Sequence, residues 1–457
     1  MLQQQHCRHL SDATSTDYLA LCISCRKDID MISNNTTERQ QPGDFDPAFN
    51  DGQLLTIPGE IAAAVVTDSA GKIYIAGAVA TNMGGYIITA LNPDGTRNRN
   101  FNNGESVIGD FMPDAYSMGM DIKILPDGKI LLVGLTQSNS RGPIMLGLAR
   151  YHPDGTLDQS FGVSGHLVPT YDYTNIQLPT FITEEDPTPD YVASNPRLSC
   201  IVDNGNIYVG LKGVHNRKNV TLIMHFDEGG YFIKEFGNNG AAVIEHPQYD
   251  TVLAQTLRID QHLYLAGYLV SDQVGALRAW ARVNTRGELD VDFGVDGFVF
   301  NNQSPGDIDK LVLQKNSKLL GCGGTGAREV VHFSNGVLAS LNQDGTQDMD
   351  FNGGRPVIQP TVDNQGSFWT GCAIQSDAHI VTCGILTYAE RNIIIGRHMP
   401  TGKPDTSFND VGWKSIRLGK KVDRAAIALQ SNNAIVVAGH LRADDASNKS
   451  FVFQLLG

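Results

Sequence analysis

Short apolar runs separated by Gly, Pro, Asn and Asp recur along most of the chain. One unit holds apolar runs at 54–57, 62–67, 72–76 and 86–91, which are rich in Ile, Val and Tyr. Runs of this length and composition between turn residues are typical of β-strands. The third run returns as KILLVG at 129–134, NIYVG at 206–210, HLYLAG at 262–267, KLLGCG at 318–323, HIVTCG at 379–384 and AIVVAG at 434–439. The pattern predicts an all-β protein built from repeats.

Each repeat carries the same punctuation, a Phe followed by Asn or Gly, with a Gly six residues before that Phe. The Phe residues are Phe49, Phe101, Phe161, Phe236, Phe293, Phe351 and Phe408, and the Gly residues are Gly43, Gly95, Gly155, Gly230, Gly287, Gly345 and Gly402. Asp stands three residues before the Phe at Asp46, Asp158, Asp290, Asp348 and Asp405. Successive Gly residues are 52, 60, 75, 57, 58 and 57 residues apart, and Gly457 lies 55 beyond Gly402. Seven intervals of similar length predict a closed ring.

The predicted strands are apolar on both faces, so each sheet has to be covered on both sides. Four-stranded sheets packed face to face around a ring satisfy this requirement, and that architecture is the β-propeller, with about four to eight blades. We expect a seven-bladed β-propeller of four-stranded antiparallel blades, a single domain over 43–457, after an unstructured leader at 1–42. No blade precedes the run at 53–57, so we expect it to complete the blade formed by 424–455. N- and C-terminal strands would then share one blade.

The turn sequences resemble those of the delta-60 repeat family of bacterial β-propellers. The resemblance is carried by PDGK at 126–129, PDGT at 93–96 and 153–156, and LARYHPDGTLDQSFG at 148–162. It covers residues 43–457 and implies a propeller fold, often with a surface or secreted location, and it transfers no catalytic residue. The chain carries no clear signal peptide, so a cytoplasmic location stays open as well.

Composition and charge exclude several classes of partner and of protein. The 35 basic and 49 acidic side chains give a net charge of −14, which disfavours nucleic acid as a partner. No apolar run approaches the roughly 18 residues of a membrane span. Seven Cys in 457 residues do not form a disulfide framework. HCRH at 6–9 and CISC at 22–25 could bind a metal but lie in the predicted leader, and we expect a monomer without metal or cofactor.

Loops in a four-stranded blade leave alternately on two faces. Those joining the first strand to the second and the third to the fourth are short turns of the Pro-Asp-Gly type, and we call their side the turn face. Those joining the second strand to the third, and the fourth to the next blade, form the variable face. They are longer and more varied, and they include 109–117, 135–143, 212–219, 245–251, 328–335 and 440–449. Because binding residues concentrate in such loops, we expect the ligand on the variable face.

One insertion stands out within the variable face. The interval from Gly155 to Gly230 exceeds the mean of the others by about 18 residues, and the excess lies at 171–195. The insertion holds acidic and aromatic residues without Lys or Arg, and the predicted binding residues are Tyr171, Asp172, Tyr173, Glu184, Glu185, Asp186, Asp190 and Tyr191. Loops beyond about 12–15 residues are often functional, although a tolerated surface insertion is the alternative.

The sequence favours a non-catalytic binding scaffold that presents the variable face to a protein or glycan ligand. The alternative is a hydrolase or lyase with a His and carboxylate site near the ring axis, because propeller lyases and lactonases build active sites from these groups. The candidates in or beside the variable loops are His246, His332, His440, Asp114, Asp250 and Asp444. A single sequence does not establish whether these residues converge.

Overall fold

The structure is a computed structural model. It describes residues 40–79, 84–138, 142–170, 176–177, 197–271, 275–326, 334–362, 365–386, 392–442 and 448–457. The chain divides into residues 1–40 and 41–457, and the account below concerns the second unit. Of the predicted leader at 1–42, only residues 40–42 are described. None of the helices in these ranges is long and apolar enough to cross a membrane.

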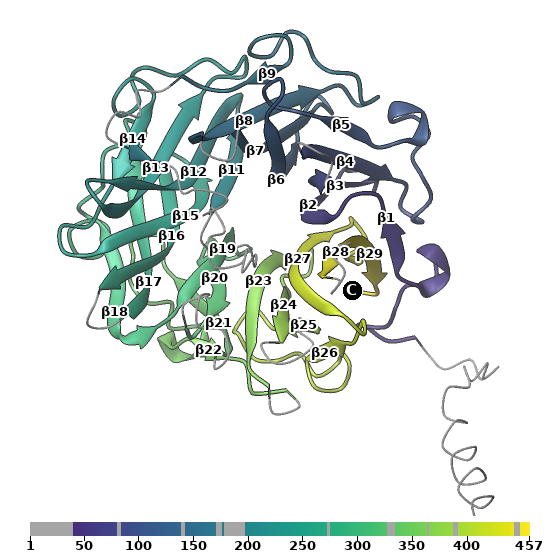
Figure 1. Ribbon diagram of the computed structural model, residues 1–457. Helices are drawn as coiled ribbons and strands as arrows, with labels where there is room; N and C mark the ends of the chain where they lie inside the picture. The colour runs from purple at the N-terminus through teal and green to yellow at the C-terminus, as the bar shows by residue number, and fades with distance from the viewer. Residues whose placement is uncertain are drawn as a thin grey trace, which may run out of the picture. The chain divides into compact units, whose positions relative to one another are not determined.

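Seven four-stranded antiparallel sheets stand around a ring, which confirms the predicted seven-bladed β-propeller (Figure 1). Blade 1 holds β2 (Ile61–Thr67), β3 (Ile73–Val79), β4 (Gly85–Leu91) and β5 (Val107–Gly109). Blade 2 holds β6 (Tyr116–Ile124), β7 (Ile130–Gln137), β8 (Ile144–Tyr151) and β9 (His166–Leu167). Blade 3 holds β11 (Leu198–Asp203), β12 (Asn206–His215), β13 (Lys218–Phe226) and β14 (Ala241–Ile244), with β10 (Ile176–Gln177) as an additional strand.

The remaining blades repeat the same order. Blade 4 holds β15 (Asp250–Ile259), β16 (His262–Ser271), β17 (Gly275–Asn284) and β18 (Phe298–Pro305). Blade 5 holds β19 (Asp307–Leu313), β20 (Leu319–Gly324), β21 (Gly336–Leu341) and β22 (Val357–Ile358), and blade 6 holds β23 (Ser367–Ile374), β24 (Ile380–Leu386), β25 (Ile393–His398) and β26 (Trp413–Ile416). Blade 7 holds β27 (Lys421–Leu429), β28 (Ile435–Arg442), β29 (Lys449–Leu455) and β1 (Leu55–Ile57). The first strand of each of blades 1–7 lies nearest the ring axis (Figure 1).

The two ends of the propeller share blade 7, as predicted. Strand β1 pairs antiparallel with β29, so that Leu55 lies opposite Val452. The turn before β1 is also hydrogen-bonded to the C-terminal end of the propeller. The Asp46 N–H donates to the Gln454 carbonyl at 3.0 Å, and Gln454 Nε2 donates to Asp46 Oδ2 at 2.6 Å. The residues that close the ring are therefore held by backbone and side-chain contacts together.

A continuous series of contacts between Phe rings and glycines joins each blade to the next, and we call it the Phe–Gly belt. Its pairs are Phe49 with Gly95, Phe101 with Gly155, Phe161 with Gly230, Phe236 with Gly287, Phe293 with Gly345, Phe351 with Gly402, and Phe408 with Gly43. Each Phe is at most 1% exposed. A Cβ on any of these glycines would lie 2.8–3.2 Å from the ring, and their φ values run from +77° to +95°. Both the contact and the backbone conformation therefore require Gly.

Backbone hydrogen bonds run beside the belt. In six of the seven pairs, the residue after the Phe donates its N–H to the carbonyl that precedes the Gly of the next repeat. The bonds are Asn50 to Asp94 (3.0 Å), Asn102 to Asp154 (2.8 Å), Gly162 to Gly229 (2.9 Å), Gly237 to Arg286 (2.7 Å), Asn352 to Thr401 (3.1 Å) and Asn409 to Pro42 (3.3 Å). The last bond joins the two ends of the propeller, so the belt closes on itself and its contacts begin before residue 43.

The Asp that stands three residues before the Phe holds the turn that carries the phenyl ring in one conformation. In blade 2, Asp158 Oδ1 accepts the Ser160 N–H at 3.1 Å, and Arg150 Nε donates to Asp158 Oδ2 at 2.7 Å. The Arg150 guanidinium also lies 4.8 Å from the centre of the Phe161 ring. Burial would raise the pKa of Asp158, but the hydrogen bonds from Ser160 and Arg150 outweigh it and hold the pKa well below its usual value. The same carboxylate contact recurs from Arg282 to Asp290 and from Arg397 to Asp405.

Removing residues 43–58 tests the closure of the ring. The deletion takes away β1 and the buried side chains of Phe49 and Ile57, so we expect the free energy of unfolding to fall by about 5 kcal/mol or more. Thermal unfolding followed by circular dichroism measures the loss. Thr56→Ala, which changes an exposed residue of β1, should leave the melting temperature nearly unchanged. A deletion variant that melts with the full chain would contradict the shared blade.

Two glycines of one turn segment test the belt. Gly345 and Gly353 both have positive φ, but a Cβ on Gly345 would lie 2.9 Å from the Gly294 nitrogen, whereas a Cβ on Gly353 meets nothing within 4 Å. Gly353→Ala should therefore cost only the backbone strain, about 1–2 kcal/mol. Gly345→Ala should cost about 1–3 kcal/mol more, because the methyl group is forced against the belt. Equal losses in urea unfolding would show that the contact does not constrain the fold.

Candidate functional site

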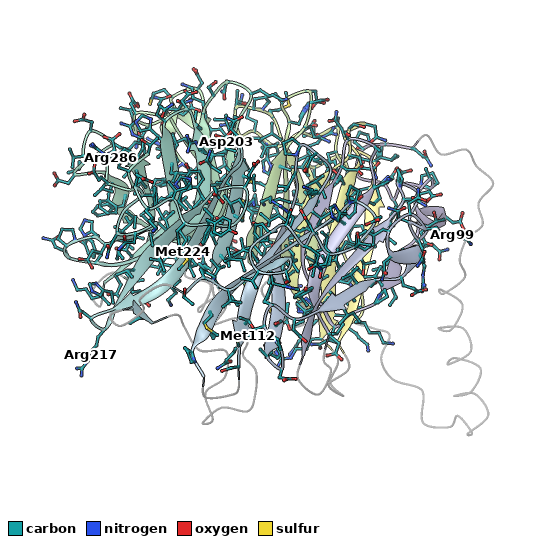
Figure 2. All side chains as sticks on the ribbon, turned by 90° about the horizontal axis from the view of Figure 1, so that it is seen from above. Arg99, Met112, Asp203, Arg217, Met224 and Arg286 are labelled. Carbon is teal, nitrogen blue, oxygen red and sulfur yellow. The ribbon has the colours of Figure 1, made fainter. Side chains whose placement is uncertain are left out.

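The two faces of the propeller are separated as the loop order predicts. Figure 2 shows the ring from its side. Asp203 and Arg286, from a first-to-second and a third-to-fourth turn, lie at one face, whereas Arg217 and Met112, from variable loops, lie at the opposite face. The variable face is therefore a distinct surface, and the candidate residues can be placed against it.

All eight predicted binding residues, and two of the catalytic candidates, lie outside the described residues. These are Tyr171, Asp172, Tyr173, Glu184, Glu185, Asp186, Asp190 and Tyr191, together with the catalytic candidates His332 and Asp444. Of the insertion at 171–195, the structure describes Ile176 and Gln177, which form β10. Strand β10 pairs with the end of β12, with Ile176 opposite His215 and Gln177 opposite Val214. The insertion therefore has one strand-paired point in blade 3.

His246 lies in the variable loop between β14 and β15, as predicted, and it belongs to an aromatic cluster. Its ring centre lies 4.8 Å from that of Tyr249 and 5.4 Å from that of Phe300 in β18. The Gln248 N–H donates to His246 Nδ1 at 3.1 Å, so the imidazole proton is assigned to Nε2. Burial lowers the pKa of His246, which favours this neutral form.

Three contacts tie the hairpin of β12 and β13 to this loop. His215 Nδ1 lies 3.5 Å from Glu245 Oε2, Lys218 Nζ donates to the Pro247 carbonyl at 3.1 Å, and Asn219 Nδ2 donates to Asp250 Oδ2 at 2.6 Å. Together with the aromatic cluster they form what we call the blade 3 platform, residues 215–219, 245–250 and Phe300. The platform brings together half-buried aromatic rings, amide and ammonium donors, and carboxylate acceptors on one surface.

His440 corrects one placement made from the sequence. The loop expected at 440–449 begins later, because β28 continues to Arg442 and pairs with β27 along its whole length, with His440 opposite Arg424. His440 is only 8% exposed and is hydrogen-bonded to the backbone of Ala62 in blade 1. Burial lowers the pKa of His440, and the nearby Asp423 opposes that shift. The residue is therefore packed between two blades.

The catalytic candidates that the structure describes occupy separate places. Asp114 is exposed in the loop between β5 and β6, where it has a φ of 55°. Asp250 begins β15 and is engaged by Asn219, while His440 lies at the inner strands of blade 7. The aromatic partners of His246 include Phe298 and Phe300 of β18, the outermost strand of blade 4. Within the described ranges, no group of three or more His, Cys, Asp or Glu side chains could hold a metal ion.

A buried polar network between blades 1 and 2 could not be found from the sequence. The Tyr86 hydroxyl lies 2.6 Å from the Tyr151 hydroxyl and 3.0 Å from His166 Nε2. Burial raises the pKa of Tyr86 well above its usual value and that of Tyr151 to about 12, so both stay protonated. The three residues come from different blades or distant strands, and no local motif joins them. Because both tyrosines are buried, the network serves the packing of the two blades.

A second unexpected contact crosses from blade 3 to blade 5. Arg197 Nη1 donates to Asp307 Oδ1 at 2.9 Å and lies 3.1 Å from Asp309 Oδ1. The Arg197 guanidinium also lies 4.9 Å from the centre of the Tyr268 ring in blade 4. All three charged side chains are buried or nearly so. The pairing joins residues that are 110 positions apart, which explains why spacing along the chain gave no sign of it.

Comparison with sequence families gives one match. Residues 125–161 match the family described as "Domain of unknown function (DUF5122) beta-propeller". This segment covers β7 and β8 and the turn that carries Phe161, so it supports a β-propeller family over that stretch. No curated protein sequence matches the chain.

Several solved structures are similar to this chain at low sequence identity. The β-propeller domain of the Trilobed protease from Pyrococcus furiosus has 10% identity and a TM-score of 0.44, over 87% of this chain and 94% of that one. An ulvan lyase from a family of polysaccharide lyases has 11% identity and a TM-score of 0.44, over 88% and 96%. A protein of unknown function from Dyadobacter fermentans has 7% identity and a TM-score of 0.40, over 88% and 97%. With every TM-score below 0.5, none of these likenesses bears on function.

Proposed function

We propose that the chain is a non-catalytic binding scaffold whose variable face holds a protein or glycan ligand. The observation that carries the proposal is the blade 3 platform. Its rings come from Tyr249, His246 and Phe300, and its polar groups come from the hairpin tied to the same loop. Loop residues that are tied to a neighbouring hairpin in this way lose little freedom on binding, which favours affinity.

The chemistry of the platform suits a sugar or a polar protein surface. Tyr249 is half-buried, and its hydroxyl has no hydrogen-bond partner among the described residues. A tyrosine ring offers an apolar surface for stacking together with a polar group at its edge. Asp250 and Asn219 lie in the same loop and hairpin and supply an acceptor and a donor. Such a combination recognises hydroxyl or amide groups that lie over an aromatic ring.

The insertion belongs to the same proposal. Because β10 pairs with β12 at Val214 and His215, the insertion is anchored directly beside the platform. We infer that its acidic and aromatic residues add contacts to the ligand. The inferred residues are Tyr171, Asp172, Tyr173, Glu184, Glu185, Asp186, Asp190 and Tyr191. Their charge would favour a basic protein or hydroxyl-rich ligand over an anionic one.

A hydrolase or lyase is the alternative. Its best support among the described residues is His440, which lies near Asp423 at the inner strands of blade 7. A general base has to come within hydrogen-bond reach of the substrate proton. At 8% exposure, His440 is closed to a substrate in this conformation, and its Nδ1 is a buried atom. The binding scaffold therefore accounts better for the described part of the variable face.

A glycan array and a pull-down with the full chain test the proposal. Once a ligand is found, Tyr249→Ala should weaken its binding at least tenfold, a change of about 1.4 kcal/mol, because a central aromatic contact is lost. Tyr231→Ala is the matched control. Tyr231 lies in the third-to-fourth turn of the same blade, on the turn face, and is 64% exposed. The control should bind like the wild type.

A second variant separates the insertion from the platform. Shortening residues 171–195 to the length of the other repeats should weaken binding further if the insertion contributes. Binding unaffected by Tyr249→Ala would reject the platform, and binding unaffected by the shortened loop would remove the insertion from the site. Glycan cleavage that is abolished by His440→Ala but retained by Tyr249→Ala would instead establish the enzyme.

A further inference from the structure

Charged side chains on the inner strands of two blades lie close enough to influence one another's pKa values near the ring axis. Asp121 and Lys123 belong to β6 of blade 2, and Lys310 belongs to β19 of blade 5. Both are inner strands, and blade 5 lies three positions beyond blade 2 in a ring of seven (Figure 1). Asp121 and Lys310 occupy equivalent positions, each just after a β-bulge, opposite Val133 and Cys322. All three side chains are half-buried.

The carboxylate of this group already has its partners. Lys123 Nζ donates to Asp121 Oδ1 at 2.8 Å, and the Ile122 N–H donates to the same oxygen at 2.9 Å. The Cys200 N–H, from blade 3, donates to Asp121 Oδ2 at 2.9 Å. Burial would raise the pKa of Asp121, but Lys123, Lys310 and these hydrogen bonds hold it below its usual value. Asp121 is therefore ionised, and it neutralises one of the two lysines.

The second lysine has no partner of opposite charge among the described residues. No described residue forms a hydrogen bond or an ion pair with the Lys310 ammonium. Its neighbour Asp309 is near Arg197 instead. Burial and the like charge of Lys123 lower the pKa of Lys310, and Asp121 offsets only part of that shift. The three groups therefore place two amines beside a single carboxylate, and an anion at this point would favour the charged form of Lys310.

In the other blades, no Asp or Glu occupies the strand positions equivalent to Asp121, Lys310 or Lys123. The residues equivalent to Asp121 and Lys310 in the other blades are Ala64, Cys200, Gln255, Gly371 and Ala426. The residues two positions further along, equivalent to Lys123, are Val66, Val202, Leu257, Val312, Ala373 and Ala428. A cation in such surroundings is costly unless it is paired. A counter-ion from solution would supply the missing charge.

We propose that Lys310 and Lys123 bind a small oxyanion, such as phosphate, sulfate or a carboxylate, at the ring axis between blades 2 and 5. Each ammonium has three donors, and Lys123 uses one of them on Asp121. Lysine binds such anions as a point charge with rotatable donors, which suits an anion held between two strands. The site joins inner strands of two blades, so an anion bound there also stabilises the ring. It is independent of the blade 3 platform.

Thermal unfolding and isothermal titration calorimetry of the full chain test this site, with inorganic phosphate, sulfate and acetate as separate probes against sodium chloride of equal ionic strength. At least one oxyanion should raise the melting temperature and bind saturably. Lys310→Met should bind that anion at least tenfold more weakly and, without the anion, should melt no lower than the wild type, because an unpaired charge is removed. Lys421→Met is the control, since Lys421 is an exposed lysine at the start of inner strand β27. It should bind like the wild type.

Two results would overturn the proposal. One is a wild-type protein that shows no saturable binding of any of the three oxyanions. The other is a Lys310→Met variant that binds the anion with wild-type affinity. If Lys310→Met does not fold, Lys310→Gln removes the charge but keeps a polar side chain of similar length. Its affinity for the anion should fall, and an unchanged value counts against the site. Acetate binding without phosphate or sulfate would assign the site to carboxylates, and the reverse would assign it to inorganic oxyanions.

Discussion

The packing of one phenylalanine ring against the glycine of the next repeat is the contact on which this propeller depends. Burying a Phe side chain contributes about 1.5–3 kcal/mol, and each ring of the Phe–Gly belt is almost completely buried. The belt repeats around the ring, and its seventh pair joins Phe408 to Gly43 across the two chain ends. Because all seven pairs are present, every blade is joined to the next by the same contact. The same series explains how seven unequal intervals fit into one compact unit.

The belt also determines where the molecule can vary. Its residues belong to the turns between third and fourth strands, and the Asp and Arg contacts beside it hold those turns in one conformation. The loops on the opposite face take no part in this network, so they can differ in length and composition without disturbing the blades. Blade 3 shows the result, because its hairpin and the loop at 245–250 are tied to each other and carry aromatic and polar groups. A rigid ring with one adaptable face is a physical basis for a binding scaffold.

Much of the fold could be predicted from the sequence, and the site could not. The seven Phe and Gly positions give the number of blades, and the unmatched strand at 53–57 gives the closure, because both follow from counting along the chain. The belt itself could not be predicted. In the sequence, each Phe lies six residues after the Gly of its own repeat, whereas in the structure it contacts the Gly of the next repeat. His246 was placed correctly in a loop, but His440 was not, because β28 extends beyond the apolar run. Arg197 meets Asp307, and Lys310 influences the pKa of Asp121, only through the curvature of the ring.

Native-state hydrogen exchange read by mass spectrometry tests the closed ring most directly. The Asn409 amide, which donates to Pro42 across the chain ends, is equivalent to the Asn352 amide, which donates to Thr401 within the chain. A closed belt predicts that both amides, and those of β1 at Leu55–Ile57 and of its equivalent β5 at Val107–Gly109, show similar protection and open together. An Asn409 amide and a β1 that exchange much faster than their counterparts would show that the ring is open at blade 7 and would contradict this account.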